Sequence, residues 1–174
     1  MNTKMTKLAL ALGALVMTGG VWAATDTANL AVSATVETIC AIGPGTLSFN
    51  TLKLEVNAGA GTVTPVNHDA NSGTSISIAC TIGSTAAITA GLGLNASVGS
   101  VRNMLSGTDL LAYELYTDSG YGTVLDSTTG AISYTGTGAA TNKTIYGRIT
   151  GAQLAAAKKG SYADTVAMTI TYTP

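Results

Sequence analysis

Apolar side chains recur at every second position within short segments of this chain, and residues that favour turns separate those segments. In residues 74–82, one parity holds Ile76, Ile78, Cys80 and Ile82. A period of two is that of a β-strand with one buried face. About eight such segments, at spacings of about 8–12 residues and without a long helical pattern, predict an all-β sandwich.

The remaining elements follow from local composition. We expect one helical turn at residues 152–159, closed by Gly160, and mainly loop at residues 55–73, with a short strand at 62–64. A turn near Asn50 is expected where the apolar parity switches. The further strands are expected at residues 46–54, 85–98, 110–117, 121–126, 131–134, 144–149 and 165–172, and residues 102–105 form a turn-bounded segment.

The first 23 residues have the pattern of a secretory signal peptide. Lys4 and Lys7 precede an apolar run at residues 8–17, and small residues before Ala24 suit cleavage. The run is shorter than the roughly 20 residues that span a bilayer, so a retained membrane anchor is the weaker alternative. We therefore expect a mature chain that begins at Ala24 and is exported.

The composition excludes several classes of function. Without Lys4 and Lys7, six basic residues remain against nine acidic ones, which gives a net charge of −3. Binding of nucleic acid requires a clustered basic surface, which this charge does not suggest. Charged residues make up only 10% of the chain, against about 25% in ordinary soluble domains. A surface with so few charges indicates a protein that is largely covered in an assembly.

Two cysteines in an exported chain are most simply one disulfide, here Cys40–Cys80. In the chain-entropy view this bond stabilises the fold by roughly 4 kcal/mol. A metal site is the weaker alternative, because His68 is the only histidine and no paired ligand spacing is present. His68 also has no sequence sign of a catalytic partner. We predict no enzyme activity, no cofactor and no metal.

Residues 24–37 alternate in the same way as the core strands. Their apolar parity consists of Ala28, Leu30, Val32, Ala34 and Val36. The pattern alone favours an ordinary first strand of a self-contained domain. The alternative is a strand that completes the fold of a neighbouring molecule, because an exposed sheet edge binds such a strand.

Several sequence blocks carry a resemblance to a known family. They are CAIG at 40–43, SIAC at 77–80, LAYELYTD at 111–118, IYGRI at 145–149 and GSYADTV at 160–166. The chain resembles the spore coat protein U domain family, whose members include pilins of archaic chaperone–usher pili. The resemblance spans essentially the whole mature chain. Residues 152–159, AQLAAAKK, depart from the shorter loop with Pro and Gly that the family leads us to expect.

The resemblance implies an incomplete immunoglobulin-like β-sandwich that lacks its last strand and is completed by a donor strand from another subunit. It implies a pilin that is exported to the periplasm and then placed in a pilus on the cell surface, with neighbouring pilins, a periplasmic chaperone and an outer-membrane usher as partners. Residues 24–37 are then the donor strand and residues 38–174 the pilin domain. The expected last strand ends near the C-terminus, so we expect its apolar parity to line the acceptor groove: Val166, Met168, Ile170 and Tyr172.

Two other functions remain open from the sequence. One is a secreted monomeric β-sandwich that binds glycans, although aromatic platforms and clustered acidic loops are lacking. The other is a structural protein similar to a spore-coat component. Formation of ladders of subunits, or dependence on a chaperone, distinguishes a pilin from a monomeric lectin.

Overall fold

The structure is a computed structural model that describes residues 24–53, 55–59, 62–66 and 69–173. The predicted signal peptide and His68 lie outside the described residues. The chain divides into two units, residues 1–35 and 36–174. In the first unit, residues 24–35 form no helix or strand and are exposed. The second unit contains the sheets.

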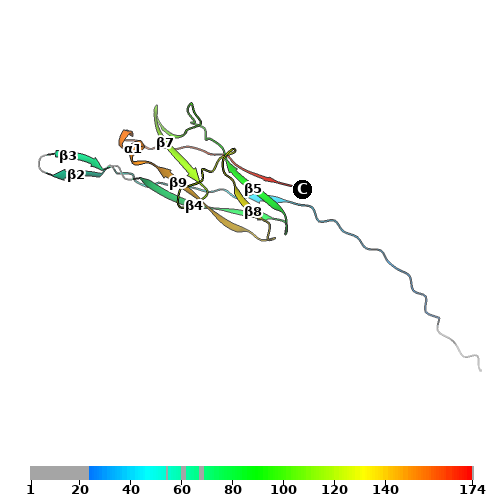
Figure 1. The fold of residues 1–174 in the computed structure, drawn as a ribbon. Coiled ribbons are helices and arrows are strands. Elements are labelled where there is room, and N and C mark those ends of the chain that lie inside the picture. The colour runs from blue at the N-terminus through cyan, green and yellow to red at the C-terminus, as the bar shows by residue number, and fades with distance from the viewer. Residues whose placement is uncertain (1–23, 54, 60–61, 67–68, 174) are drawn as a thin grey trace, which may run out of the picture. The chain divides into compact units, whose positions relative to one another are not determined.

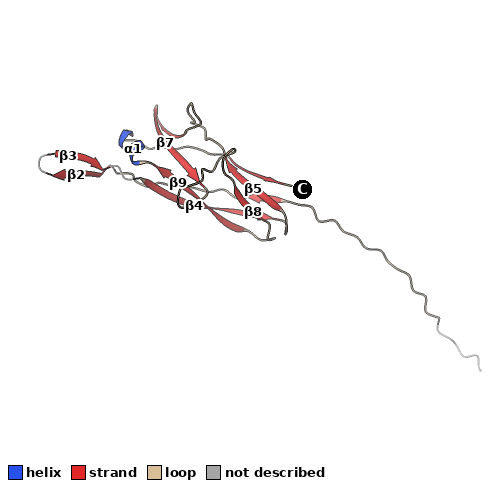
Figure 2. Cartoon of the chain, in the orientation of Figure 1, coloured by secondary structure: helices blue, strands red, loops and turns tan. Residues whose placement is uncertain are grey.

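Two antiparallel sheets form the body of the second unit (Figures 1 and 2). The five-stranded sheet has the order β1 (Cys40–Ile42), β4 (Ala70–Cys80), β9 (Thr141–Ile149), β7 (Asp109–Tyr116) and β6 (Arg102–Ser106). The three-stranded sheet has the order β10 (Met168–Tyr172), β5 (Thr85–Ala90) and β8 (Ile132–Thr135). A separate hairpin pairs β2 (Glu55–Gly59) with β3 (Thr62–Val66). The prediction of an all-β fold is confirmed.

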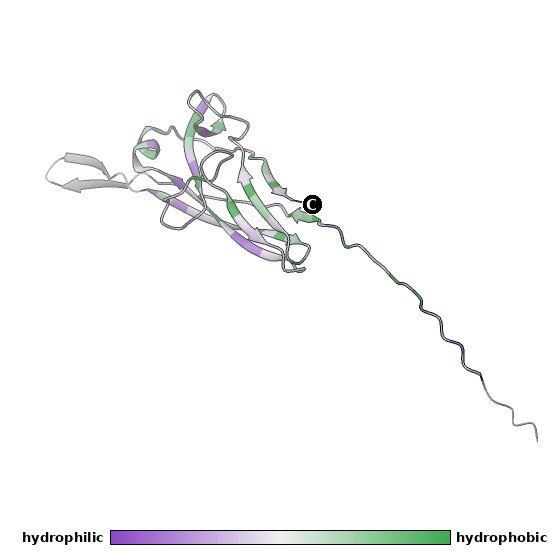
Figure 3. Ribbon diagram, turned by 45° about the vertical axis from the view of Figure 1, so that its right-hand side comes forward, coloured by the Kyte–Doolittle hydropathy of each residue, from purple (hydrophilic) through white to green (hydrophobic). Residues whose placement is uncertain are grey.

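The core is one cluster to which both sheets contribute alternate residues, and the alternation is visible along the strands in Figure 3. In β7, for example, Leu111, Tyr113 and Leu115 are buried while the residues between them are partly exposed. Period-two patterning thus becomes burial on one face of each strand. The other buried apolar members are Ile76, Ile78, Cys80, Ala86, Ile88, Ala90, Leu125, Ile132, Tyr134, Ile145 and Ile149.

The predicted disulfide is present. Cys40 and Cys80 face each other in the register of β1 and β4, with 4.2 Å between their Cα atoms. The bond therefore fixes the edge strand β1 to the longest strand of the sheet. No other cysteine occurs in the chain.

The short helix α1 (Gly151–Ala156) overlaps the helical turn predicted at residues 152–159, but it begins one residue earlier and ends at Ala156, with Ala157 rather than Gly160 at its C-terminal cap. Thr150 caps its N-terminus: the Thr150 hydroxyl accepts a hydrogen bond from the Gln153 amide, and the Gln153 side chain accepts one from the Thr150 amide. This capping box satisfies two backbone N–H donors that the helix leaves unpaired. The predicted helical turn is therefore present, and the capping box, which the sequence analysis did not use, places its start at Gly151.

Three expectations about strands were wrong. Residues 46–53 form no strand, although the predicted turn is present, with Asn50 at a φ of 55°. Residues 121–126 also form a loop, because the Asp118 carboxylate accepts hydrogen bonds from the amides of Gly120, Gly122 and Thr123, which competes with strand pairing. Residues 55–73, expected mainly as loop, hold β2, β3 and the start of β4.

Two smaller expectations also need correction. Residues 102–105, expected as a turn-bounded segment, belong to strand β6. Ile82 shares the parity of Ile78 and Cys80, but its side chain is 77% exposed. Strand β4 ends at Cys80, and the chain then turns through Gly83 at a φ of +80°. Parity predicts burial only while the strand continues.

Candidate functional site

An apolar groove lies between two segments from opposite ends of the second unit. Residues 45–49 line one side, and residues 162–168 line the other. The cavity between them has a volume of about 300 Å³. Strands β4, β9, β7 and β6 supply its floor: Thr74, Ile76, Ile145, Tyr113, Leu115 and Met104. We call this surface the groove, and its two sides the N-terminal wall (45–49) and the C-terminal wall (162–168).

Close packing holds the N-terminal wall against the sheet. A Cβ atom on Gly147 of β9 would lie 2.9 Å from both Leu47 and Phe49, so the missing side chain leaves room for these two residues. Similarly, a Cβ on Gly45 would lie 2.8 Å from the Ile76 side chain. Leu47 and Phe49 are half-buried and pack against the core. Residues 46–49 therefore act through their side chains as a wall rather than through strand pairing.

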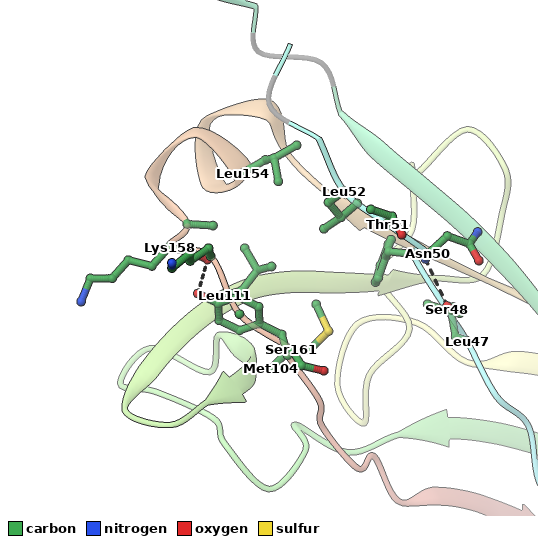
Figure 4. Close-up of a pocket in the computed structure, with 15 residues that line it drawn as sticks. Leu47, Ser48, Asn50, Thr51, Leu52, Met104, Leu111, Leu154, Lys158 and Ser161 are labelled. Atoms are coloured by element: carbon green, nitrogen blue, oxygen red, sulfur yellow. Dashed lines mark hydrogen bonds between the residues drawn. The ribbon is translucent and has the colours of Figure 1, made fainter. Parts of the chain in front are cut away.

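A second cavity of about 580 Å³ lies next to the groove, beside α1. Leu47, Phe49, Met104 and Tyr162 line both cavities, so the two spaces are neighbours. Figure 4 shows Leu52, Met104, Leu111 and Leu154 around this second space. The hydrogen bond from the Asn50 amide to the Ser48 hydroxyl shapes its rim (Figure 4). The first cavity is lined mainly by apolar residues, whereas Ser48, Asn50, Thr51 and Lys158 add polar groups to the lining of the second.

The strand β10 is an edge strand among the described residues. It pairs with β5 over Met168–Tyr172, and β5 in turn pairs with β8. An edge strand presents unpaired N–H and C=O groups that can bind another strand. The C-terminal wall leads directly into β10, so the groove offers both a backbone edge and apolar side chains.

The predicted acceptor residues take two kinds of position. Val166 and Met168 line the groove. Ile170 and Tyr172 lie further along β10, where they are partly buried and pack against the core cluster. All four share one parity, while Thr169 and Thr171 between them are exposed.

Residues 24–37 are exposed throughout. Leu30, Val32 and Val36 have exposed fractions of 87%, 83% and 81%. Ala28 and Ala34, of the same parity, are also exposed. Burial of a leucine or valine side chain is worth about 1.5–3 kcal/mol, so Leu30, Val32 and Val36 would gain free energy on contact with another surface.

One polar pair interrupts the apolar lining. The Tyr113 hydroxyl on the floor donates a hydrogen bond of 2.7 Å to the Asp164 carboxylate on the C-terminal wall. Burial, together with this hydrogen bond and the charge of Asp164, raises the pKa of Tyr113 above its ordinary value. The phenol therefore stays protonated and keeps donating over the physiological pH range.

Sequence reasoning missed most of the groove. It identified only the β10 parity, whereas the lining also includes Leu47, Phe49, Met104, Tyr113 and Asp164. The single phenylalanine of the chain, Phe49, shares a parity with Leu47, and that pairing was the available signal. Met104 and Tyr113 gave no such signal, because they resemble ordinary core residues.

The described residues offer little else for chemistry. Among them, no group of three or more His, Cys, Asp or Glu side chains could hold a metal ion. No helix within the described ranges has the length and hydropathy needed to cross a membrane.

Comparison with known proteins places the chain in a family. The model of the Spore Coat Protein U domain matches residues 26–169. The chain belongs to the Spore Coat Protein U domain family. The chain is also similar to Protein U of Myxococcus xanthus, with 37% identity over 164 residues, a match that covers 86% of this chain and 87% of Protein U. The resemblance found in the sequence is confirmed.

A solved structure is also similar to this Spore Coat Protein U domain. It is the CsuC–CsuE chaperone–tip adhesion subunit pre-assembly complex from archaic chaperone-usher Csu pili of Acinetobacter baumannii. The TM-score is 0.49 and the sequence identity is 20%. The match covers 78% of this chain and 40% of that chain, so this chain spans less than half of the solved one.

Proposed function

We propose that this chain is a structural subunit of a surface pilus (fimbria) that is assembled by chaperone–usher donor-strand exchange. The subunit is exported to the periplasm, held there by a chaperone, passed to an outer-membrane usher and incorporated among neighbouring pilins. It supports adhesion and biofilm formation as part of the fibre. Its mechanism is binding and assembly, without turnover of a substrate.

The observation that carries this proposal is the apolar groove beside an edge strand. A strand laid in the groove would pair with the backbone of β10 and bury its apolar side chains against Leu47, Met104 and Val166. Backbone hydrogen bonds then supply affinity, while pockets for alternate side chains supply specificity. Membership in the Spore Coat Protein U domain family supports the same function.

The donor of this strand is residues 24–37 of the next subunit, and residues 38–174 form the accepting domain. The donor side chains are Ala28, Leu30, Val32, Ala34 and Val36, and Val166, Met168, Ile170 and Tyr172 belong to the acceptor groove. A slip by one residue would turn Asn29, Ser33 and Glu37 inward instead. Burial of the Glu37 carboxylate without a partner makes that slip costly, which fixes the parity.

Deletion of residues 24–37 from the exported chain tests the proposal. In periplasmic extracts, the full chain should give a ladder of polymers, whereas the deleted chain should give only a chaperone-bound or degraded subunit. Adding a synthetic peptide of residues 24–37 should protect the deleted chain from proteolysis. A deleted chain that is a stable monomer without any chaperone or peptide would contradict the proposal and favour a self-contained β-sandwich.

A further inference from the structure

The C-terminal wall of the groove crosses from one sheet to the other. Ala163 exchanges two backbone hydrogen bonds with Leu105 of β6, at 2.9 and 3.1 Å. Four residues later, the carbonyl of Ala167 accepts a hydrogen bond of 2.8 Å from the Gly91 amide, and β10 then pairs with β5. Because β6 and β5 belong to different sheets, residues 164–166 bridge the gap between two sets of pairings.

The Asp164 carboxylate anchors this crossing. One of its oxygens accepts hydrogen bonds of 3.0 Å from the Leu94 amide and from the Asn95 side chain. The other accepts the hydrogen bond from Tyr113. The loop that supplies these donors fits closely, since a Cβ atom on Gly93 would lie 2.0 Å from an Asp164 oxygen. Gly93 also has a φ of +84°, which favours glycine.

Tyr113 contacts both walls of the groove. Its ring packs edge-to-face against Phe49 of the N-terminal wall, with 6.4 Å between the ring centroids. Its hydroxyl reaches Asp164 of the C-terminal wall. The side chain is only 6% exposed, so neighbouring residues restrict its movement. One rigid side chain on the floor thus connects the two walls.

We propose that Tyr113 and Asp164 are positioning residues that hold the two walls of the groove at the separation a donor strand requires. The inference rests on the proposed function, because it concerns the strand that the groove accepts. A site held in its binding geometry loses less free energy on ordering when the ligand binds. Charge-assisted hydrogen bonds are the stronger kind, so the Tyr113–Asp164 contact suits this role.

A general role in stability makes a different prediction. If the pair only stabilised the domain, its loss would reduce the fraction of folded chain and leave the remaining folded molecules with an unchanged groove. If the pair sets the separation of the walls, each folded molecule would hold the donor less tightly. The rate at which bound donor leaves distinguishes the two roles, since it does not depend on how much of the protein is folded.

The full chain is refolded at low concentration in the presence of an excess of fluorescein-labelled peptide of residues 24–37, so that the labelled peptide rather than a neighbouring subunit fills the groove. Release of the bound peptide is followed by fluorescence anisotropy after an excess of unlabelled peptide is added. The test variants are Tyr113→Phe, which removes only the hydroxyl, Asp164→Asn, and the double variant. The control is Tyr134→Phe, because Tyr134 is a buried tyrosine of β8 whose hydroxyl contacts Thr137 and Thr141 outside the groove.

We expect Tyr113→Phe and Asp164→Asn each to release the peptide about tenfold faster than the wild type, as loss of one hydrogen bond to a charged group implies. The double variant should be no faster than the faster single variant, because both changes break the same contact. Tyr134→Phe should release the peptide at the wild-type rate.

The inference is overturned if the wild type binds the peptide but both single variants release it at the wild-type rate. It is also overturned if the effects of the two single changes multiply in the double variant. If the wild type itself does not bind the peptide, the donor-strand function fails and this inference fails with it. A variant that does not fold leaves the other single variant to decide.

Discussion

Replacement of Val32 by aspartate should abolish the polymer while leaving the subunit able to fold on its chaperone. Val32 is at the centre of the donor parity and is 83% exposed in the isolated chain. In the polymer it is expected to enter the groove of the next subunit. The chaperone complex should survive, since the chaperone supplies its own strand to the groove in the proposed pathway.

The magnitude follows from two losses on insertion. The first is the burial of the valine side chain, worth about 1.5 kcal/mol. The second is neutralisation of the new carboxyl, which costs about 4 kcal/mol at pH 7 because its ordinary pKa is near 3.9 and each pKa unit corresponds to about 1.4 kcal/mol. Together they weaken each subunit contact by about 5.5 kcal/mol, or roughly four orders of magnitude in affinity.

The assay compares polymer ladders and chaperone-bound subunit in the same periplasmic and surface fractions. Ser33→Asp is the matched control, since it places the same charge one position away on the opposite face of the strand, and it should be much milder. Ala34→Trp should also abolish the polymer, because its pocket is expected to be shallow. A wild-type polymer yield from Val32→Asp, or loss of the chaperone complex together with the polymer, would refute the assignment of this strand.

Three further predictions concern the domain itself. The intact mass of the mature protein should be two hydrogens below that of the reduced chain. Cys40→Ser or Cys80→Ser should lower the free energy of unfolding by about 2–5 kcal/mol in urea titrations. Two alkylatable thiols in periplasmic material would contradict the disulfide. Arg102→Met should lower the free energy of unfolding by about 3 kcal/mol in the same titrations. Arg102 is buried, pairs with Glu114 and donates hydrogen bonds to the carbonyls of Gly91, Ala90 and Leu125, which the substitution leaves without their donor. A loss below about 0.5 kcal/mol would show that these acceptors find other partners. Hydrogen bonds from Thr129 and Thr128 hold the pKa of Asp126 below its ordinary value, so the contribution of Asp126 to stability is present above about pH 4 and is lost as the pH falls further. Asp126→Asn should therefore lower the melting temperature more at pH 7 than at pH 3. An equal effect at both pH values would exclude this contribution.

The sequence by itself determined the fold class, the disulfide and the core parity of several strands. Ile76 and Ile78 were predicted on one face of a strand and are buried there, since a period of two separates the two faces without any knowledge of neighbours. The pairing of Cys40 with Cys80 followed from their being the two cysteines of a chain that begins with the pattern of a secretory signal peptide. The helix α1 was also predictable, because its capping residues act within three positions of one another.

The tertiary structure decided where strands end and which segments form the groove. Ile82 has the parity of a core residue, yet it is exposed because β4 stops at Cys80. Arg102 is charged, yet it is almost fully buried, since carbonyl groups from distant segments surround it. Neither outcome is encoded within a few residues of the position concerned.

The groove is the clearest case of a feature that only the tertiary structure reveals. Phe49, Tyr113 and Asp164 are far apart in the sequence, and each has an ordinary local context. They meet because the sheet brings β7 beneath two segments that come from opposite ends of the domain. Local periodicity specifies which face of a strand is apolar, whereas contacts between distant segments specify what that face touches.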